Sequence, residues 1–442
     1  VGVHADHFPG VLVRQGLRLE SIQSISIVDY GFLLDLPPEQ FIALLRPSVV
    51  VKGKEHEVHS NAEQEAVEAY DGKLLFGSGE VRFSSLDLLQ RELLEVNFST
   101  ITKPTDFPER HGFSFSDLAT VVRRFVSLRL LVVGDLIVDE YVNCEPLGMS
   151  QEDPTIVVSP IKRDRFVGGA GIVAAHARGL GASVRYFGVC GQDEAATFAG
   201  EMLDRFQVEN DFLVDESRPT TLKQRYRAAG KTLLRVSHLR QHDISQDIAE
   251  HLCENICSVL DETDLVIFSD FNYGCLPQSA VDHLSAECAR RGIRMVADSQ
   301  ASSQISDVSR FSNMMLLTPT EYEARLAVRD FSSGLVVLAD TLLKKALASQ
   351  IVITLGADGL LIHAPQREKG DLLTDRLPAF NSAPKDVSGA GDSLLACASM
   401  ALATGADIWK SAYLGSLASA VQVSRVGNIP LSSSELLTEL NN

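Results

Sequence analysis

The feature that most constrains the fold of this chain is a series of short, continuous apolar runs from residue 130 onward. Helical stretches separate each run from the next. Strands that are apolar on both faces are typical of parallel sheets that helices cover from both sides. The runs therefore predict an α/β fold with a central parallel sheet, extending to about residue 431. They are LLVVG at 130–134, LVIF at 265–268, MVAD at 295–298, MMLLT at 314–318 and IVITLG at 351–356.

Two other segments of this region have a different pattern. Residues 155–166 and 220–238 alternate polar and apolar side chains, and the second contains an Ala-Ala-Gly-Lys turn at 228–231. An alternation with a period of two indicates strands with one face in contact with the core and the other in solvent. We expect these segments to form a separate, half-exposed sheet.

The amino-terminal part of the chain predicts a second, smaller domain. Residues 1–96 contain short apolar runs that alternate with helical patterns, which favours a small parallel α/β unit. Residues 97–114 carry three Pro and Gly residues with little periodicity, so we expect a linker there. The larger domain is then expected over residues 115–442.

Composition and charge exclude several classes of protein. The chain of 442 residues has 40 Lys and Arg against 58 Asp and Glu, a net charge of −18, so we expect no nucleic-acid partner. Its seven cysteines form no Cys-x-x-Cys pair, which argues against a disulfide framework or a zinc site. We find no signal peptide and no apolar run of about 20 residues that could span a bilayer. A cytoplasmic protein with no membrane contact is expected.

The motif that bears most directly on chemistry is DVSGAGD at 386–392, which precedes an apolar helical stretch. Glycines let backbone N–H groups approach an anion closely, and the start of a helix favours negative charge. Asp392 could accept a proton from an alcohol while these N–H groups hold a phosphoryl group. The motif taken alone is equally compatible with a glycine-rich turn that Asp392 caps.

Further glycines and several acidic residues follow predicted strands. VGGAGIVAAH at 167–176 and TLGADG at 354–359 are compatible with close backbone packing as well as with ligand binding. In an open parallel sheet, the ligand site lies beyond the carboxyl ends of the strands. Acidic side chains gathered there suit hydroxyl groups and magnesium, although any one of them could be a helix cap. They are Asp135, Asp139, Asp270, Asp298, Glu321 and Glu323.

In this order along the chain, the motifs resemble those of the ribokinase-like, or phosphofructokinase-B-type, carbohydrate kinases. The resemblance implies a central sheet with helices on both faces and a small β lid. Within the family, SQEDPTIVV at 150–158, RPTTLKQRYR at 218–227 and LLRVS at 233–237 resemble heptose-7-phosphate kinases. The family landmarks are GDLIVDEY at 134–141, VGGAGIVAAHARGLGA at 167–182, SDFNYG at 269–274, TPTEYEA at 318–324, TLGADG at 354–359 and DVSGAGDS at 386–393.

The amino-terminal region resembles part of a nucleotidyltransferase domain that accompanies such heptose kinases. Residues 44–76 and 82–92 are similar to the second half of that domain. The family's nucleotide-binding His-x-Gly-His motif does not occur in residues 1–96. We therefore expect a partial, Rossmann-like domain without nucleotidyl-transfer activity in the chain as given.

The resemblance also assigns roles to individual residues, with ATP and Mg²⁺ as the implied cofactors. Asp392 is implied as the base that deprotonates the acceptor hydroxyl. The other implied site residues are Gly389, Ala390 and Gly391 for the transferring phosphoryl group, Asp139, Gly168, Gly169 and Asp270 for the sugar, Thr354, Gly356 and Gly359 for the ATP phosphates, and Glu323 for magnesium.

Four positions depart from the family pattern. Ile172 replaces the asparagine that contacts the sugar, and Thr320 replaces the asparagine of Asn-x-x-Glu. Tyr273 and Gln300 stand where heptose kinases have lysines. The best prediction is an ATP-dependent kinase for D-glycero-D-manno-heptose 7-phosphate, expected to dimerise through its lid. A kinase for another sugar or sugar phosphate, or a weakened paralogue with a binding role, are the alternatives.

Overall fold

The chain forms two compact units, Val1–Ser99 and Thr100–Asn442. No helix in the described parts of either unit is long and apolar enough to cross a membrane. The computed structural model describes residues 2–3, 15–23, 28, 30–53, 62–77, 100–228, 231–300, 306–365 and 372–442.

The first unit contains short parallel strands with helices between them. β3 and β4 pair in parallel, as do β1 and β2. Ile42 and Val67 are buried side chains of two of its helices. The elements are β1 (Gly2–Val3), α1 (Gln15–Gln23), β2 (Phe32–Leu33), α2 (Pro38–Leu45), β3 (Val49–Gly53), α3 (Ala62–Glu68) and β4 (Lys73–Gly77).

A nine-stranded sheet forms the centre of the second unit, in the order β17-β16-β15-β14-β13-β12-β5-β8-β9. The strands from β15 to β9 are parallel, which confirms the predicted parallel sheet, whereas β16 and β17 add an antiparallel edge. The strands are β5 (Arg129–Gly134), β8 (Ser183–Cys190), β9 (Glu209–Val214), β12 (Leu265–Asp270), β13 (Arg294–Ser299), β14 (Leu316–Leu317), β15 (Ile351–Thr354), β16 (Leu360–Pro365) and β17 (Leu372–Leu377).

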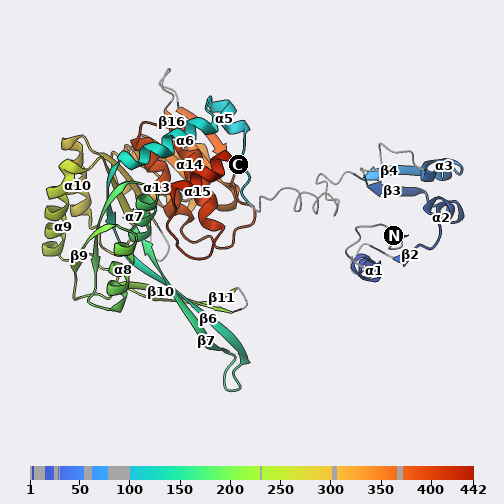
Figure 1. Ribbon diagram of the computed structural model, residues 1–442, viewed down its shortest axis with the longest axis horizontal. Coiled ribbons are helices and arrows are strands. Elements are labelled where there is room, and N and C mark those ends of the chain that lie inside the picture. The colour runs from blue at the N-terminus through green and yellow to red at the C-terminus, as the bar shows by residue number, and fades with distance from the viewer. Residues whose placement is uncertain are drawn as a thin grey trace. The chain divides into compact units, whose positions relative to one another are not determined.

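Helices cover both faces of this sheet (Figure 1). Because successive side chains of a strand point to opposite faces, Leu130 and Val132 of β5 join one apolar cluster and Leu131 and Val133 the other. The first cluster includes residues of α6 (Phe115–Arg124), α7 (Ala170–Gly179), α8 (Glu194–Arg205), α13 (Ala390–Ala403), α14 (Ile408–Val423) and α15 (Ser433–Asn441). The second includes residues of α9 (Gln246–Val259), α10 (Gln278–Arg291), α11 (Glu321–Val328) and α12 (Leu335–Ala346).

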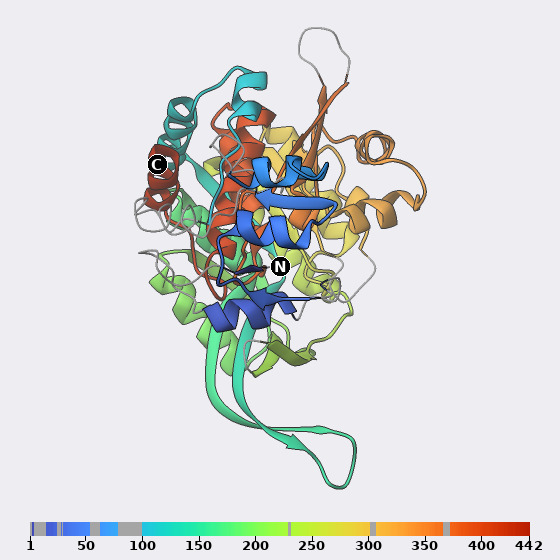
Figure 2. The ribbon, with the colours of Figure 1, turned by 90° about the vertical axis from the view of Figure 1, so that its right-hand side faces the viewer.

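Four strands form a separate sheet, the lid, in the order β11-β10-β6-β7. β6 (Leu136–Met149) and β7 (Ile156–Gly169) make a long antiparallel hairpin that projects from the unit (Figures 1 and 2). β10 (Thr221–Ala228) runs parallel to β6, and β11 (Lys231–His238) pairs with β10 in the antiparallel sense. The two alternating segments of the sequence thus lie in the lid, which confirms that expectation.

A short helix lies inside the stretch for which the sequence indicated a linker. α5 (Asp106–His111) belongs to the second unit, and Phe107 within it is fully buried. The ring of Phe107 lies 6.2 Å from that of Tyr413, whose hydroxyl donates to the carbonyl oxygen of Pro104. The described part of the predicted linker, residues 100–114, thus belongs to the second unit, because aromatic side chains within it pack into the core of that unit.

Candidate active site

The start of α13 has the features that the DVSGAGD motif indicates. Gly389 is the residue before the helix and has a φ of 76°, a conformation that favours glycine. A Cβ atom there would lie 2.6 Å from Oδ1 of Asn428. A Cβ atom on Gly391 would meet nothing within 4 Å, so space is open beside the first turn. The backbone N–H groups of this turn can therefore receive an anionic group.

Asp392 lies in the same first turn and is buried. Burial and, to a smaller extent, the nearby charge of Asp139 raise the pKa of its carboxyl group to about 7, although a hydrogen bond from Gln300 and the charge of Lys223 act in the opposite direction. A carboxylate with a pKa near neutrality suits a general base that acts at physiological pH. The environment of Asp392 is thus compatible with its predicted role.

Gln300 links Asp392 to a second acid. Its side-chain amide nitrogen lies 3.0 Å from Oδ1 of Asp392 and 3.4 Å from Oδ2 of Asp298. Burial raises the pKa of Asp298, and the charges of Glu323 and Asp392 raise it further. Oδ1 of Asp298 is buried and has no hydrogen-bond partner among the described residues. This unpaired oxygen could accept a hydrogen bond from a ligand or from a metal-bound water.

Glu323 serves as a helix cap. Its carboxylate accepts a hydrogen bond of 2.8 Å from the backbone of Thr320, while the Thr320 hydroxyl accepts one of 3.2 Å from the backbone of Glu323. This capping box stabilises the start of α11. The described residues contain no group of three or more His, Cys, Asp or Glu side chains arranged to hold a metal. Mg²⁺ usually keeps water and phosphate ligands, so a kinase site does not require such a group.

Asp139 of the lid approaches the glycine pair closely. A Cβ atom on Gly168 would lie 2.5 Å from Oδ2 of Asp139, so only glycine leaves room for this carboxylate. Asn428 donates to the same oxygen at 3.1 Å, and Arg225 lies 3.6 Å from the other. Oδ1 of Asp139 and Oδ1 of Asn428 are buried without hydrogen-bond partners among the described residues. Two such acceptors beside Gly389 suit the hydroxyl groups of a sugar.

Asn428 is a residue that sequence reasoning missed. It lies in an irregular segment after α14, and no motif or periodicity marks it. Ile172, by contrast, was predicted at the sugar site. It lies in the first turn of α7 and is completely buried. Gly169 precedes this helix with a φ of 59°, and a Cβ there would lie 2.4 Å from the carbonyl oxygen of Asp135.

Two acids at strand ends organise the loop at residues 271–275. Asp135 accepts hydrogen bonds from the backbone N–H groups of residues 271, 273 and 275. Asp270 accepts from Ser299 at 2.7 Å and from Arg310 at 2.8 Å through Oδ2, and its Oδ1 accepts from the backbone of residue 272. Asp270 is buried, and its carboxylate is engaged within the protein. A sugar contact for Asp270 remains a prediction.

The lid places a lysine near the position at which Tyr273 replaces the family's lysine. The ammonium group of Lys223 lies 5.1 Å from the centre of the Tyr273 ring and 5.3 Å from that of Phe271. Burial raises the pKa values of Asp139 and Asp392, and the charge of Lys223 partly opposes this rise. Positive charge is therefore present on this side of the site, supplied by a strand distant in sequence.

The predicted ATP loop follows β15 at the carboxyl end of the sheet. Thr354 ends β15 and forms an isolated bridge with Thr320. Gly356 and Gly359 have φ values of 61° and 87°, and a Cβ on Gly359 would lie 2.1 Å from the carbonyl oxygen of Leu377. The backbone geometry thus requires glycine at position 359 and favours it at position 356. This geometry neither requires nor opposes their predicted contacts with ATP.

The structure thus has a glycine-led helix start with a buried carboxyl group, at the carboxyl end of a parallel sheet and beside a β lid, which is the arrangement that the resemblance to carbohydrate kinases implies. Residues 128–435 match the pfkB family of carbohydrate kinases. The chain belongs to this family, and it is a carbohydrate kinase.

The curated relatives include proteins named bifunctional protein HldE. That of Desulfatibacillum aliphaticivorans is 32% identical over 324 residues, which are 72% of this chain and 64% of the relative. That of Helicobacter hepaticus is 33% identical over 322 residues, which are 70% of this chain and 63% of the relative. The chain thus spans less than two thirds of the length of these relatives.

Solved structures show the same fold at low sequence identity. Phosphofructokinase-2 from Escherichia coli, solved with potassium, has a TM-score of 0.58 and 15% identity, covering 71% of this chain and all of that one. Arabidopsis thaliana ribokinase, solved with ribose and ATP, has a TM-score of 0.55 and 18% identity, covering 71% of this chain and 99% of that one. These comparisons confirm the predicted ribokinase-like fold.

Proposed function

We propose that this carbohydrate kinase transfers the γ-phosphoryl group of ATP to the anomeric hydroxyl of D-glycero-D-manno-heptose 7-phosphate. One observation supports the phosphotransferase chemistry most directly. Asp392 is buried in the first turn of α13, and its carboxyl group has a pKa of about 7. The heptose assignment rests on the motifs at 150–158, 218–227 and 233–237, and the relatives named HldE are compatible with it.

The proposed reaction follows from the positions of the polar groups. The sugar lies between Asp139 and Asp392, and its hydroxyl groups donate to Oδ1 of Asp139 and Oδ1 of Asn428, neither of which accepts a hydrogen bond from the described residues. Asp392 accepts the proton of the acceptor hydroxyl as its oxygen bonds to the γ-phosphorus, and the bond from that phosphorus to the bridging oxygen of ADP breaks. The backbone N–H groups at Gly389, Ala390 and Gly391 stabilise the phosphoryl oxygens.

Magnesium fits this arrangement as an ion held mainly by phosphates and water. Asp298, with its unpaired buried oxygen, and Glu323 are the acids that would hold it. When bound, the ion neutralises charge on the phosphates of ATP. The loop with Thr354, Gly356 and Gly359 would position those phosphates.

The test of the kinase activity compares ATP consumption by the wild type and Asp392→Asn over a panel of sugars and sugar phosphates. Loss of a general base costs about 10²–10⁴ in rate. We expect turnover with a heptose 7-phosphate and a loss of this size in the variant, with ATP binding retained. A variant with more than half of the wild-type turnover would contradict the assignment of the base.

A weakened paralogue with a binding role is the second candidate. Ile172, a completely buried apolar residue in place of the asparagine that contacts the sugar, favours it. The same panel distinguishes the two candidates, because a binding protein would bind a sugar in a titration without consuming ATP. A cytoplasmic location remains a prediction.

We also propose a homodimer that forms through the lid. The lid strands carry exposed large apolar side chains, which isolated lids would leave in water. Light scattering should give twice the mass of the chain, and Leu234→Asp should give a monomer. A wild-type monomer at micromolar concentration would contradict this proposal. The exposed side chains are Leu147, Met149, Ile156, Val157, Ile161, Leu233 and Leu234.

A further inference from the structure

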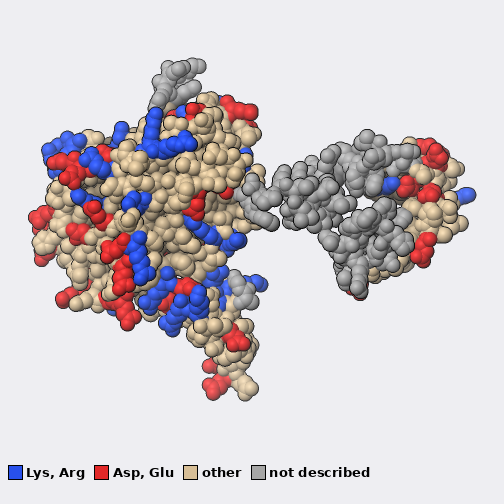
Figure 3. Space-filling view, in the orientation of Figure 1, with Lys and Arg blue, Asp and Glu red and all other residues tan. Residues whose placement is uncertain are grey.

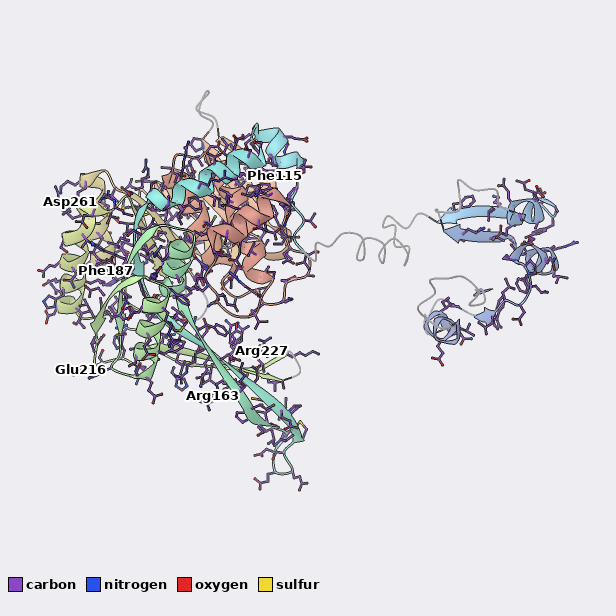
Figure 4. The ribbon with its side chains drawn as sticks, viewed as in Figure 1. Phe115, Arg163, Phe187, Glu216, Arg227 and Asp261 are labelled. Atoms are coloured by element: carbon purple, nitrogen blue, oxygen red, sulfur yellow. The ribbon has the colours of Figure 1, made fainter. Side chains whose placement is uncertain are left out.

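One arginine contacts both of the connections through which β10 and β11 join the central sheet. The chain enters β10 from β9 through residues 215–220, and it leaves β11 toward α9 through residues 239–245. Arg218 lies in the first connection, and its side chain is only 7% exposed. It begins the RPTTLKQRYR motif, and none of the roles assigned above uses it. Figure 4 labels Glu216 in the same connection and Arg227 on the lid.

The guanidinium group of Arg218 binds three segments of the chain. Its Nε donates to Oδ2 of Asp215 at 2.7 Å, and one terminal nitrogen donates to the carbonyl oxygen of Tyr273 at 2.7 Å. The other terminal nitrogen donates to the carbonyl oxygen of His242 at 2.8 Å and lies 2.9 Å from Nδ1 of that residue. We call these contacts the lid clamp. The planar fork of an arginine can bridge several acceptors in this way, whereas a lysine presents one point charge.

Asp215 anchors the lid clamp to the central sheet. Its backbone N–H donates to the carbonyl oxygen of Cys190, the last residue of β8, at 2.9 Å. Burial tends to raise the pKa of Asp215, but hydrogen bonds from Ser217 and Arg218 outweigh this effect and lower the pKa. Asp215 is therefore a charged partner for the arginine. Figure 3 shows Lys and Arg next to Asp and Glu in the region where the lid meets the body of the unit.

The loop at residues 271–275 is held from two sides. Asp135 accepts hydrogen bonds from three of its backbone N–H groups, and Arg218 donates to one of its carbonyl oxygens. Gly274 in this loop has a φ of 88°, and a Cβ atom there would lie 2.1 Å from the carbonyl oxygen of His242. The second lid connection thus packs directly against the loop. A backbone in such a conformation persists where the surrounding contacts fix it.

The position of β10 decides which side chains reach the sugar site. The ammonium group of Lys223 lies over the rings of Phe271 and Tyr273, at 5.3 and 5.1 Å from their centres. Arg225, two residues further on the same face of the strand, lies 3.6 Å from a carboxylate oxygen of Asp139. Both side chains follow shortly after the lid clamp in sequence, so a shift of the clamped connection would move them.

We propose that Arg218 is a positioning residue that holds both lid connections against the loop at 271–275 and thereby fixes β10 beside the sugar. Arg218 contacts none of the groups assigned above to the sugar, to ATP or to phosphoryl transfer, so it acts through the lid. This inference rests on the proposed position of the sugar between Asp139 and Asp392.

Two substitutions of Arg218 separate its position-holding role from its contribution to stability. Arg218→Met keeps the length of the side chain and removes every donor. Arg218→Lys keeps a positive charge beside Asp215, so its melting temperature should stay close to that of the wild type. An ammonium group cannot bridge the three acceptors of the lid clamp, so the lid should still be released.

Arg291→Met is the matched control. Arg291 is also a partly buried arginine that ties segments together, since it donates to the carbonyl oxygen of Cys257 and to the carboxylates of Asp261 and Glu287. These partners lie in α9, in α10 and in the turn after α9. Asp261 is labelled in Figure 4, away from the lid strands.

The first measurement is hydrogen exchange of the full chain without ligands. The backbone amides of β10 and β11 should exchange at least about tenfold faster in both Arg218 variants than in the wild type, while those of β13 keep their rates. Arg291→Met should leave the exchange of β10 and β11 unchanged. Wild-type rates in the lid of both Arg218 variants would overturn the inference, and so would an equal acceleration throughout the second unit.

The second measurement is steady-state kinetics with ATP and D-glycero-D-manno-heptose 7-phosphate. Both Arg218 variants should lose about 10- to 100-fold in kcat/KM for the sugar, because a small misplacement of groups around a substrate is costly. Their KM for ATP, and every constant of Arg291→Met, should stay within about twofold. Wild-type kcat/KM in Arg218→Lys, or an equal loss in Arg291→Met, would contradict the inference.

The two measurements distinguish failure of the lid clamp from failure of the proposed function. Hydrogen exchange requires neither a sugar nor turnover. If the lid amides respond as expected but the wild type does not phosphorylate the heptose, the proposed substrate is wrong and the lid clamp stands. If the wild type phosphorylates the heptose and the lid amides of the Arg218 variants do not respond, the kinase proposal stands and the lid clamp is wrong.

Discussion

The side-chain amide of Gln300 donates a hydrogen bond of 3.0 Å to the carboxylate of Asp392, although 92 residues separate the two in sequence. Gln300 is one of the positions at which this chain departs from heptose kinases, which have a lysine there. A neutral amide stabilises the charged carboxylate less than an ammonium group would. The replacement of lysine by glutamine at position 300 therefore acts directly on Asp392, the proposed base.

Gln300→Leu should therefore raise the pKa of Asp392, because the hydrogen bond from Gln300 lowers it in the wild type. Asp392 must be deprotonated to act as a base, so the acidic limb of the profile of kcat against pH should move to higher pH. Gln300→Lys should move it to lower pH. The measurement is kcat against pH for the wild type and the two variants. Identical acidic limbs in the three profiles would show that Gln300 does not act on the base.

Asp392→Asn should stabilise the protein at pH 8 and have little effect at pH 4. The pKa of Asp392 is raised to about 7 in the folded state from an ordinary value of 3.8, so the folded state binds the proton more tightly. Wild-type stability then falls as the pH rises from about 4 to 7, by at most about 4 kcal/mol. Urea unfolding at both pH values measures the difference. An equal effect of the substitution at both values would contradict the raised pKa.

The two glycines of the GAGD turn should respond differently to substitution. Gly391→Val has space for its side chain, so we expect normal thermal stability and loss of activity because the side chain blocks the phosphoryl group. Gly389→Ala adds a Cβ at a φ of 76° against Asn428, so it should lose stability as well, by about 1 kcal/mol or more. Melting curves measure the stability of the two variants, and steady-state kinetics measure their activity. Full activity of Gly391→Val would show that the turn is only structural.

Ile172→Asn tests substrate choice. An isoleucine offers no hydrogen bond and disfavours a buried hydroxyl, so the preferred sugar should lack a hydroxyl there or turn it toward solvent. The variant should improve turnover of ordinary heptoses or hexoses and leave the native substrate equal or worse. Ile172→Val is the control for packing, since the side chain is completely buried. Lower activity on every sugar together with a lower melting temperature would mean that Ile172 only packs.

Residues 1–96 should show no nucleotidyl transfer in this chain, because they contain no His-x-Gly-His motif. The measurement is pyrophosphate release from ATP with a sugar 1-phosphate. Pyrophosphate formed by the whole chain but not after removal of these residues would refute the prediction.

The central sheet was predictable because burial on both faces leaves a local pattern. The runs at 130–134 and 265–268 are apolar without interruption, and each forms a buried parallel strand. The turn and the helix start at the GAGD motif were also predictable, because two glycines beside an apolar helical stretch mark a local change of backbone, although the motif alone left a ligand site and a capped turn equally open. Even the capping box of Thr320 and Glu323 has a sequence signature, Thr-x-x-Glu, which could have shown that Glu323 caps α11.

Other parts of the site were decided by tertiary structure alone. Asn428 contacts Asp139 across 289 positions of sequence, and no periodicity marks such a pair. The same holds for Arg225 and Ser388, which only the docking of the lid brings together. Sequence patterns reflect the solvent exposure and the local backbone conformation of a segment, so they predict helices, strands and turns. Contacts between distant side chains depend on how the elements pack, and only the folded chain determines them.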